Sequence, residues 1–334
     1  MNASAMGMPK TLTNADIIAF LQNNSDASTF LNTDHDEQCI ALPAQFGSGY
    51  IRRHLLQPGL ILDIADVELN YNHVNRIQLH SPQMPLTASF YLSGQAVVTN
   101  EALPTPQTER AGNNYLYHLP QTAEIEEYHA NQRICCLKLY FDLDHFPQLN
   151  LQQLATQSSN LSTPIYTPHK LYCENPTTPR MHLVLEQLAT CSLQGIARNI
   201  YLAGKALELL GLQLEAIITP QASLPACLHP TDVEQIHKAR YILIQNYLNP
   251  PSLMELARQV GINDRKLKQG FRDVFGTSVF NYLYQYRMDK ARQLLTSGQW
   301  NVTETAHAVG YASRTAFVAA FTKQFKVSPN TYRP

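Results

Sequence analysis

The sequence predicts an α+β protein of two domains, in which a β-rich N-terminal domain with a helical segment precedes an all-α C-terminal domain. Short strand-like runs broken by turn residues fill roughly residues 37 to 143, whereas helical periodicity begins after Pro179. Charge divides in a similar way: from His229 onward 14 Lys and Arg stand against 7 Asp and Glu, while the rest of the chain has 11 against 19. The basic C-terminal part also contains an internal repeat.

The overall composition is that of a globular protein with two cores. The chain has 334 residues, and single cores usually stop growing at roughly 250 to 300 residues. Hydrophobic residues make up 44% and charged residues 15%, which excludes extensive disorder. No run approaches the ~18 apolar residues of a membrane span, and the N-terminus lacks the order of a secretion signal. We expect a cytoplasmic protein that makes no membrane contact.

Four segments are expected along the chain. Residues 1–36 are polar and are interpreted as a mobile arm. Residues 37–218 form the N-terminal domain: alternation in LTASFYLSG and QRICCLKLYF predicts an antiparallel sheet or small barrel, and two helices follow. The second helix carries an apolar stripe that suits either core or a dimer seam, comprising Ile200, Ala203, Leu207, Leu210 and Leu214. The proline-rich residues 219–230 form a linker to the C-terminal domain, 231–334.

The C-terminal domain begins its first helix pair at Ser252. This serine and Glu255 have the spacing of a capping box, and Gly261 ends the helix where a left-handed backbone is needed. Leu267 and Phe271 then supply the buried side of a second helix. The pattern is typical of a helix-turn-helix unit.

The same pattern recurs further along the chain. Gly261 and Gly310 are 49 residues apart, and Phe271 and Phe321 are 50 apart, which one extra residue in the second unit explains. The linking helix, SVFNYLYQYRMDKARQLL, would fix the spacing of the two units. If it is rigid, the second helix of each unit faces a successive major groove, roughly 34 Å apart.

The exposed face of the first unit's second helix is cationic. The residues on this face are Arg265, Lys266, Lys268, Gln269 and Arg272. A cationic helix that follows a tight turn suits the major groove of DNA, whose phosphates also attract the basic C-terminal part of the chain. The alternative is a solvated charged surface, against which the repeat and the charge division both argue.

Residues 231–334 resemble the AraC/XylS family of bacterial transcription activators. The resemblance lies in LARQVGIN, FRDVFG, YRMDKARQLL and AVGYASRTAFVAAFTKQFKVSPNTYR. It implies double-stranded promoter DNA and RNA polymerase as partners and a homodimer as the assembly. It places base contacts at Arg265, Lys268 and Gln269 in the first unit; in the second unit we expect DNA contacts from Ser313, Arg314, Thr315, Val318, Ala319 and Lys323. The apolar pair Val318 and Ala319 departs from the polar residues many members carry, so the second unit is expected to read bases less.

The segments YLSGQ and EIEEYHANQRICCLKL, together with the first unit, are similar to the siderophore-responsive, pyochelin-receptor-regulator branch of that family. This resemblance implies a cupin-like sensor domain and a ferric siderophore as effector, with no intrinsic cofactor. An anionic aromatic chelate would favour cations and rings in its pocket, so the candidate effector residues are Tyr50, Arg52, Arg53, Tyr91, Tyr115 and Tyr117. The alternatives are another effector, such as a sugar or an aromatic acid, a metal-dependent cupin-like enzyme fused to a DNA reader, and a ligand-independent regulator controlled by a partner protein.

No catalytic or metal-binding motif accompanies these features. The chain lacks a Gly-rich phosphate loop, a G-x-S-x-G elbow, an H-E-x-x-H helix and any His-x-His pair. Glu126, Glu127 and His129 are the nearest approach to a metal site, and we interpret them as a surface carboxylate cluster. Cys135 and Cys136 are adjacent in a strand, so their side chains should point to opposite faces of the sheet. We therefore expect a protein that is not an enzyme and holds no metal of its own.

Overall fold

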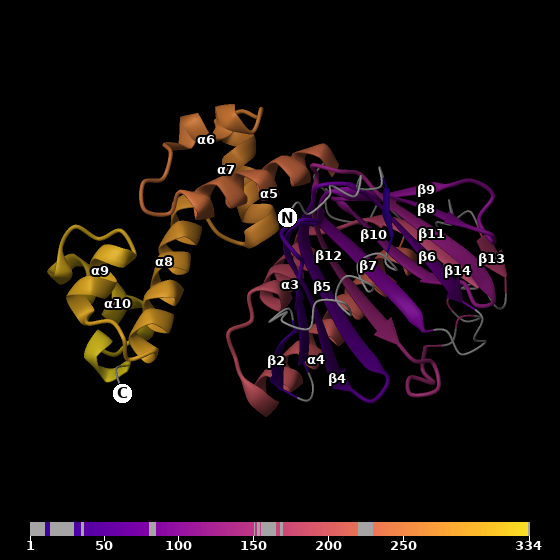
Figure 1. Ribbon diagram of the computed structural model, residues 1–334, viewed down its shortest axis with the longest axis horizontal. Coiled ribbons are helices and arrows are strands. Elements are labelled where there is room, and N and C mark those ends of the chain that lie inside the picture. The colour runs from indigo at the N-terminus through magenta and orange to yellow at the C-terminus, as the bar shows by residue number, and fades with distance from the viewer. Residues whose placement is uncertain are drawn as a thin grey trace, which may run out of the picture. The chain divides into compact units, whose positions relative to one another are not determined.

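The computed structural model describes residues 11–13, 30–34, 37–79, 85–149, 151, 154, 165–167, 170–219 and 230–332 (Figure 1). The chain forms two compact units, Met1–Glu234 and Gln235–Pro334. The first is β-rich and the second is helical, as the sequence predicts. Residues 220–229 of the expected linker lie outside the described residues.

The β-rich unit contains two sheets. One has five strands in the order β1-β6-β11-β8-β9, and the other has nine in the order β13-β14-β10-β7-β12-β5-β4-β3-β2. The pairings are antiparallel except for β1 with β6. The strands are β1 (Thr11–Thr13), β2 (Phe30–Asp34), β3 (Glu37–Ala41), β4 (Gly47–Gln57), β5 (Leu60–Leu69), β6 (Asn72–Leu79), β7 (Leu86–Ser93), β8 (Gln95–Asn100), β9 (Gln107–Arg110), β10 (Asn113–His118), β11 (Thr122–Tyr128), β12 (Arg133–Phe141), β13 (Ile165–Thr167) and β14 (Lys170–Pro176).

The central strands of the larger sheet are covered on both faces. In β7 the residues Leu86, Ala88 and Phe90 belong to one hydrophobic core, while Tyr91 belongs to a second. Successive side chains of a strand point to opposite faces, so each face of this sheet has its own core. The first core lies under helices, and the second includes residues of the five-stranded sheet such as Ala96 of β8.

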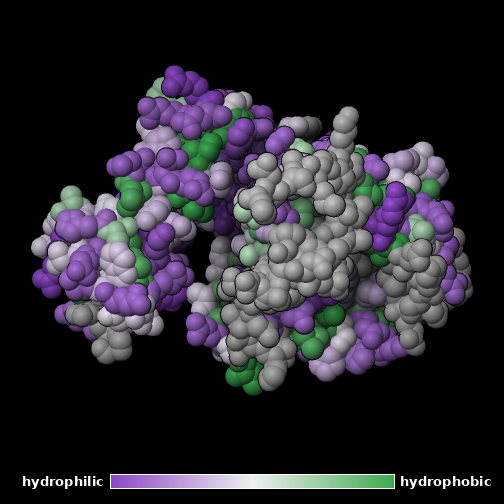
Figure 2. Space-filling model, in the orientation of Figure 1, coloured by the Kyte–Doolittle hydropathy of each residue, from purple (hydrophilic) through white to green (hydrophobic). Residues whose placement is uncertain are grey.

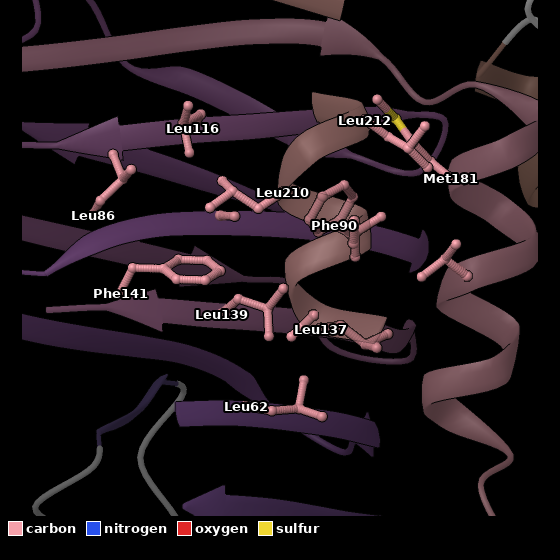
Figure 3. Packing of buried hydrophobic residues seen from close by; sticks show 14 of the residues in the cluster. Leu62, Leu86, Phe90, Leu116, Leu137, Leu139, Phe141, Met181, Leu210 and Leu212 are labelled. Atoms are coloured by element: carbon pink, nitrogen blue, oxygen red, sulfur yellow. The ribbon is translucent and has the colours of Figure 1, made fainter. Parts of the chain in front are cut away.

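Two helices, α3 (Pro179–Ala189) and α4 (Gly195–Ile218), cover the face of the nine-stranded sheet that carries the first core. Figure 3 shows Leu86, Phe90, Leu137 and Leu139 of the strands in one packed cluster with Leu210 of α4. Burying such a side chain contributes about 1.5 to 3 kcal/mol relative to leaving it exposed. The long apolar stretch after Pro179 is helical because its buried residues recur every three to four positions.

The apolar stripe expected along α4 does not share one environment. Ala203 and Leu210 are buried in the core, but Ile200 is 68% exposed and Leu207 is 42% exposed. The buried face of α4 is centred instead on Leu202, Ala206 and Leu209, one position around the helix from the stripe chosen by sequence. In the single chain part of this stripe therefore faces solvent.

Two strands fall within the segment interpreted as a mobile arm. Thr11–Thr13 pairs in parallel with β6, and Phe30–Asp34 pairs with β3. These pairings differ from the expected mobile arm, because sheet edges offer unpaired backbone groups to a polar segment of low hydrophobicity. The other residues of 1–36 lie outside the described residues.

The helical unit consists of two short-helix pairs joined by a long helix (Figure 1). Its elements are α5 (Pro230–Gln245), α6 (Leu253–Gln259), α7 (Asp264–Phe275), α8 (Val279–Thr296), α9 (Val302–Ala308), α10 (Arg314–Phe325) and the 3-10 turn η2 (Pro329–Tyr332). Phe271 and Phe275 of α7 pack on Tyr282 near the start of α8. Phe317 and Phe321 of α10 pack with Met288 and Leu295 further along α8. The long helix thus contributes to both cores.

Candidate nucleic-acid interface

The first helix pair is built as its sequence predicts. Ser252 caps α6 by accepting a hydrogen bond from the backbone N–H of Glu255, whose carboxylate accepts in return from the Ser252 N–H at 2.8 Å. Gly261 has φ +73°, a left-handed conformation that other residues rarely adopt. Asn263 then caps α7 by accepting from the Lys266 N–H at 2.8 Å. These caps fix where α7 begins and hence which side chains it exposes.

All five predicted residues of α7 lie on its exposed side, namely Arg265, Lys266, Lys268, Gln269 and Arg272. The opposite side is buried through Leu267 and Phe271, both fully inaccessible. At least two of the five have carboxylate partners on the same helix. Lys268 Nζ lies 3.0 Å from Asp264, and the Gln269 amide donates to Asp273 at 2.8 Å. Such exposed pairs are weak and leave the side chains able to change partners.

The second pair repeats this construction with different chemistry. Asn301 and Glu304 form its capping box, and Gly310 makes the turn with φ +83°. Ser313, a predicted contact, is the cap of α10 and accepts from the Ala316 N–H at 3.5 Å. Its hydroxyl therefore has a structural role at the start of the helix.

An open hollow of about 620 Å³ lies along the exposed side of α10. Five predicted residues line it together with Thr322, which sequence reasoning missed: Arg314, Thr315, Val318, Ala319, Thr322 and Lys323. Thr322 follows Ala319 by three residues, so helical spacing alone was a usable signal. This surface is less cationic than that of α7. Figure 2 shows hydrophilic residues over much of the visible face of the helical unit.

The structure separates the candidate effector residues into two groups. Arg53 makes a two-pronged ion pair with Asp63, which raises the Arg53 pKa, and Arg52 lies 3.2 Å from Glu37 and 4.9 Å from the centre of the Tyr50 ring. These three candidates lie on β4. The other group, Tyr91, Tyr115 and Tyr117, lies in the core between the two sheets.

The tyrosine group surrounds polar residues that the sequence analysis missed. Lys138 of β12 lies 2.5 Å from Glu126 of β11, and Glu126 also accepts hydrogen bonds from Tyr128 at 3.1 Å and Asn75 at 3.0 Å. Burial opposes ionisation of Glu126, but the charge and hydrogen bond of Lys138 outweigh it and lower the Glu126 pKa. The pair is thus ionised inside the sandwich.

Two further carboxyls lie near this pair. Burial, together with neighbouring carboxyls, raises the pKa of Glu109 to about 8, and Ser89 donates to it at 3.3 Å. Burial and Glu126 also raise the pKa of Glu124. We call Glu109, Glu124, Glu126 and Lys138, with the tyrosines around them, the buried polar cluster. The sequence did contain a signal for this cluster. The alternation of side chains along β11 and β12 places Glu124, Glu126 and Lys138 at positions that point into the interior.

The interpretation of Glu126, Glu127 and His129 as a surface cluster needs correction. Glu126 is 3% exposed and bonded to Lys138, whereas Glu127 and His129 are exposed. The side chains of successive residues in a strand point to opposite faces of the sheet, so residues that are close together in the sequence need not share one surface. Cys135 and Cys136 alternate as expected, one in each core.

Two further features of the described residues concern metal binding and membrane insertion. Within the described ranges, no group of three or more His, Cys, Asp or Glu residues is placed to hold a metal ion. None of the described helices is long and apolar enough to cross a membrane.

Two family models match the chain. The model described as the regulatory protein PchR N-terminal domain matches residues 46–228, which is more than half of the chain. A helix-turn-helix domain model matches residues 256–334. The two matches fall on the β-rich unit and on the two helix pairs, respectively.

Individual relatives agree with the models. Regulatory protein PchR of Pseudomonas aeruginosa is 40% identical over 136 residues, which cover 40% of this chain and 45% of that protein. The HTH-type transcriptional regulator AlkR of Acinetobacter baylyi is 33% identical over 114 residues, 34% of this chain and 36% of that protein. The matched segments thus span less than half of either relative.

Solved structures with similarity include an AraC-type transcriptional regulator from Chromobacterium violaceum, at 26% identity over 30% of this chain and 88% of that chain, with a TM-score of 0.28. ToxT from Vibrio cholerae, bound to an unsaturated fatty acid, is 13% identical over 83% of this chain and 95% of that chain, with a TM-score of 0.29. With a PchR-type N-terminal domain followed by two helix-turn-helix units, the chain belongs to the AraC-type family of DNA-binding transcription regulators, alongside the regulatory protein PchR.

Proposed function

We propose that the protein is a cytoplasmic transcription activator that responds to a ferric siderophore and controls genes of iron uptake. The buried polar cluster in the β-rich unit is the observation that carries this proposal. A buried ion pair between Lys138 and Glu126 is costly to desolvate, and hydrophobic residues of similar volume often replace such pairs without loss of stability. Strongly shifted pKa values in one place favour a functional site over plain core.

The chemistry of the cluster suits an anionic, aromatic ligand. Lys138 offers a cation, and Glu109, protonated at neutral pH because its pKa is about 8, offers a hydrogen-bond donor. The tyrosine rings offer flat apolar surface, with Tyr117 stacked on Tyr172 at 6.1 Å between ring centres. A phenolate or carboxylate of the chelator would take the place of Glu126 at Lys138. The chelator supplies the iron ligands, so the protein needs none of its own.

Calorimetric titration of the full-length protein tests this effector. Ferric pyochelin-type chelates should bind saturably, and the iron-free chelators should bind more weakly. Lys138→Met should weaken binding at least tenfold because it removes the only cation of the cluster among the described residues. Lys170→Met, which alters a lysine of β14 outside the cluster, should bind as the wild type does. Saturable binding of a sugar or an aromatic acid instead would replace the siderophore by that effector.

We propose that α7 and α10 are recognition helices, with Arg265, Lys268 and Gln269 of α7 reading bases. Arg and Lys match the acceptors of guanine in the major groove, and the glutamine amide matches adenine. Lys266 and Arg272 lie on the same exposed side and are suited to phosphates. On α10, Arg314 and Lys323 are suited to phosphates, while Val318 and Ala319 can meet only a thymine methyl group. When bound to promoter DNA in this way, the protein would recruit RNA polymerase. Because promoter DNA lies in the cytoplasm, the proposed site of action is the cytoplasm.

We further propose that two copies pair through α4. Its exposed stripe contains Ile196, Ile200 and Leu207, and, apart from the backbone of α4 and the adjoining residues, no atom of the described residues lies within 4 Å of a Cβ built on Gly204 or Gly211. In an antiparallel two-fold pair, the register that sets Ile200 opposite Gly211 also sets Leu207 opposite Gly204, since each pair of residue numbers has the same sum. The stripe is therefore complementary to a second copy of itself, as a two-fold interface requires.

A further inference from the structure

The two helix pairs are connected by more than the long helix α8. Tyr247 follows α5, which packs on the first pair through His237, whose ring centre is 5.2 Å from that of Phe275. The Tyr247 hydroxyl nevertheless donates a 3.1 Å hydrogen bond to the carbonyl of Ala308, the last residue of α9. The segment between α5 and the first pair is thus bonded directly to the second pair.

Arg287, in the middle of α8, holds the same segment by its backbone. Its Nε donates to the carbonyl of Tyr247 at 2.8 Å, and its Nη2 donates to that carbonyl and, at 3.2 Å, to the carbonyl of Leu248. These carbonyls follow the C-terminal end of α5, where carbonyls lack partners within the helix and a cation is favoured. The rigid, planar guanidinium fixes the direction of approach.

Tyr247 is also enclosed by the neighbouring turns of α8. The ammonium of Lys290 lies 4.5 Å from the centre of its ring, and the ring of Tyr286 lies 5.7 Å away. Gly310, in the turn of the second pair, leaves space for Arg287, because a Cβ there would lie 2.9 Å from Arg287 Nη2. The turn glycine therefore has a second role beside its positive φ.

We propose that Tyr247, Arg287 and the Ala308 carbonyl form a clasp that sets the spacing between the two DNA segments bound by α7 and α10. A single helix between two bodies can bend and let them turn, and a second connection away from its axis removes that freedom. Two linked modules bind together most tightly when the link matches the distance between their sites. Tyr247 and Arg287 are thus positioning residues, and this inference rests on the proposed roles of both recognition helices.

The test measures spacing preference with the full-length protein. A two-part binding site is first selected from randomised duplexes by the wild type. Binding is then measured on that duplex, on versions with one or two base pairs inserted between the parts, and on a duplex with only the first part. The variants are Tyr247→Phe, which removes only the hydroxyl, and Arg287→Lys, which keeps the charge. Tyr286→Phe is the control, because its described contact with Tyr247 is made by the ring.

The wild type and the control should bind the lengthened duplexes much more weakly than the selected one. Tyr247→Phe should lose affinity for the selected duplex about 3- to 10-fold, because it removes one hydrogen bond. Its affinity for the lengthened and single-part duplexes should change little, so its spacing preference shrinks. Arg287→Lys should change in the same direction. The clasp alone would be overturned if the variants kept the wild-type spacing preference. It would also be overturned if they lost as much affinity for the single-part duplex as for the selected duplex. Selection of only a single-part site by the wild type would overturn the role of α10 and the clasp with it.

Discussion

Arg265 and Arg272 lie on the same helix but differ in position along it. Arg265 is in the first turn of α7, directly after the cap, and Arg272 is in the last turn. The first turn of a recognition helix approaches base edges, whereas its end is nearer the backbone. The two arginines therefore allow base reading and phosphate contact to be tested separately.

Arg265→Ala should cost about 1 to 3 kcal/mol on the selected duplex and relax the preference at one base position. Binding curves on the selected duplex, its single-base variants and random duplex measure both effects. Arg272→Ala is the matched control and should weaken binding to all duplexes alike. An equal loss on random and selected DNA for Arg265→Ala would refute base reading.

Lys326→Gly should stabilise the helical unit by about 0.5 to 1 kcal/mol. Lys326 follows α10 with φ +63°, where the first pair has Gly276 at φ +68°. A side chain is strained in this left-handed conformation, and glycine removes the strain while it adds freedom to the unfolded chain. Urea unfolding measures the change, and Lys323→Gly, inside α10, should destabilise instead. A destabilising Lys326→Gly would contradict the expected strain.

The buried carboxyl of Glu109 should make the β-rich unit less stable as pH rises from about 6.5 to 8. Its pKa is near 4.5 in the unfolded chain and about 8 when folded, so between these values the unfolded state releases a proton that the folded state keeps. Below pH 6.5 the low pKa values of His54 and His182, both about 4 and due first to burial, act in the opposite direction. Melting of the wild type and of Glu109→Gln across pH 6.5 to 8 measures this, and the variant should show the flatter profile. Parallel profiles would contradict a raised Glu109 pKa.

At the scale of elements, the two helix pairs share a scaffold but not a surface. Each has a capping box, a glycine turn and a pair of phenylalanine rings in contact at matching positions. The exposed side of α7 carries four cationic residues, whereas α10 presents Val318 and Ala319 between Arg314 and Lys323. Packing constrains the buried residues of both pairs, and the exposed ones were able to diverge. This asymmetry favours α7 as the main reader.

Ile200→Glu should convert a dimer into a monomer, because it places a charge opposite Gly211 of the second copy in an apolar seam. Sedimentation across a range of concentrations gives the assembly state. Leu183→Glu, at a residue of α3 that is 37% exposed and away from the stripe, is the control and should stay dimeric. A wild type that stays monomeric, or an Ile200→Glu dimer, would contradict pairing through α4.

On the scale of the whole molecule, the division of charge matches the division into units. The basic part is the helical unit, and the acidic part is the β-rich unit, whose buried polar cluster has no counterpart among the described cores of the helical unit. The acidic β-rich unit is repelled by DNA, which is a polyanion, so contact with DNA is limited to the helical unit. The proposed ligand site and the proposed DNA-binding helices therefore lie in separate parts of the chain.

A fragment from residue 230 to 334 should keep the sequence preference of the full chain and lose any response to ferric chelates. It contains α5 and both helix pairs, and its excess of basic residues should give a salt dependence of DNA binding similar to that of the full protein. Binding to selected and random duplexes at several salt concentrations, with and without ferric chelate, measures this. A folded fragment without sequence preference would contradict the assignment of DNA reading to this unit.

How much the sequence predicted differs between the two units. In the helix pairs, the capping serine, the turn glycines and the exposed residues of α7 were predicted, because caps, turn glycines and helical periodicity are local signals. Phe280 of α8, an apolar residue of the linking segment, is 49% exposed, since a helix that serves two cores on different sides leaves some apolar residues between them. In the β-rich unit the only local signal was the alternation of apolar and polar residues, which predicts strands. The order of the strands depended on pairings between segments distant in the sequence.

The sequence by itself determined the two-domain division, the duplicated helix pairs and the cationic side of α7, because each depends on residues close together in the chain. Only the tertiary structure decided that Lys138, Glu126 and the tyrosines share one interior, that Arg52 and Arg53 lie apart from them with carboxylate partners, and that Tyr247 reaches Ala308. These contacts join residues brought together by sheet pairing and helix packing. Their free energy depends on burial and exact neighbours, which no local pattern contains.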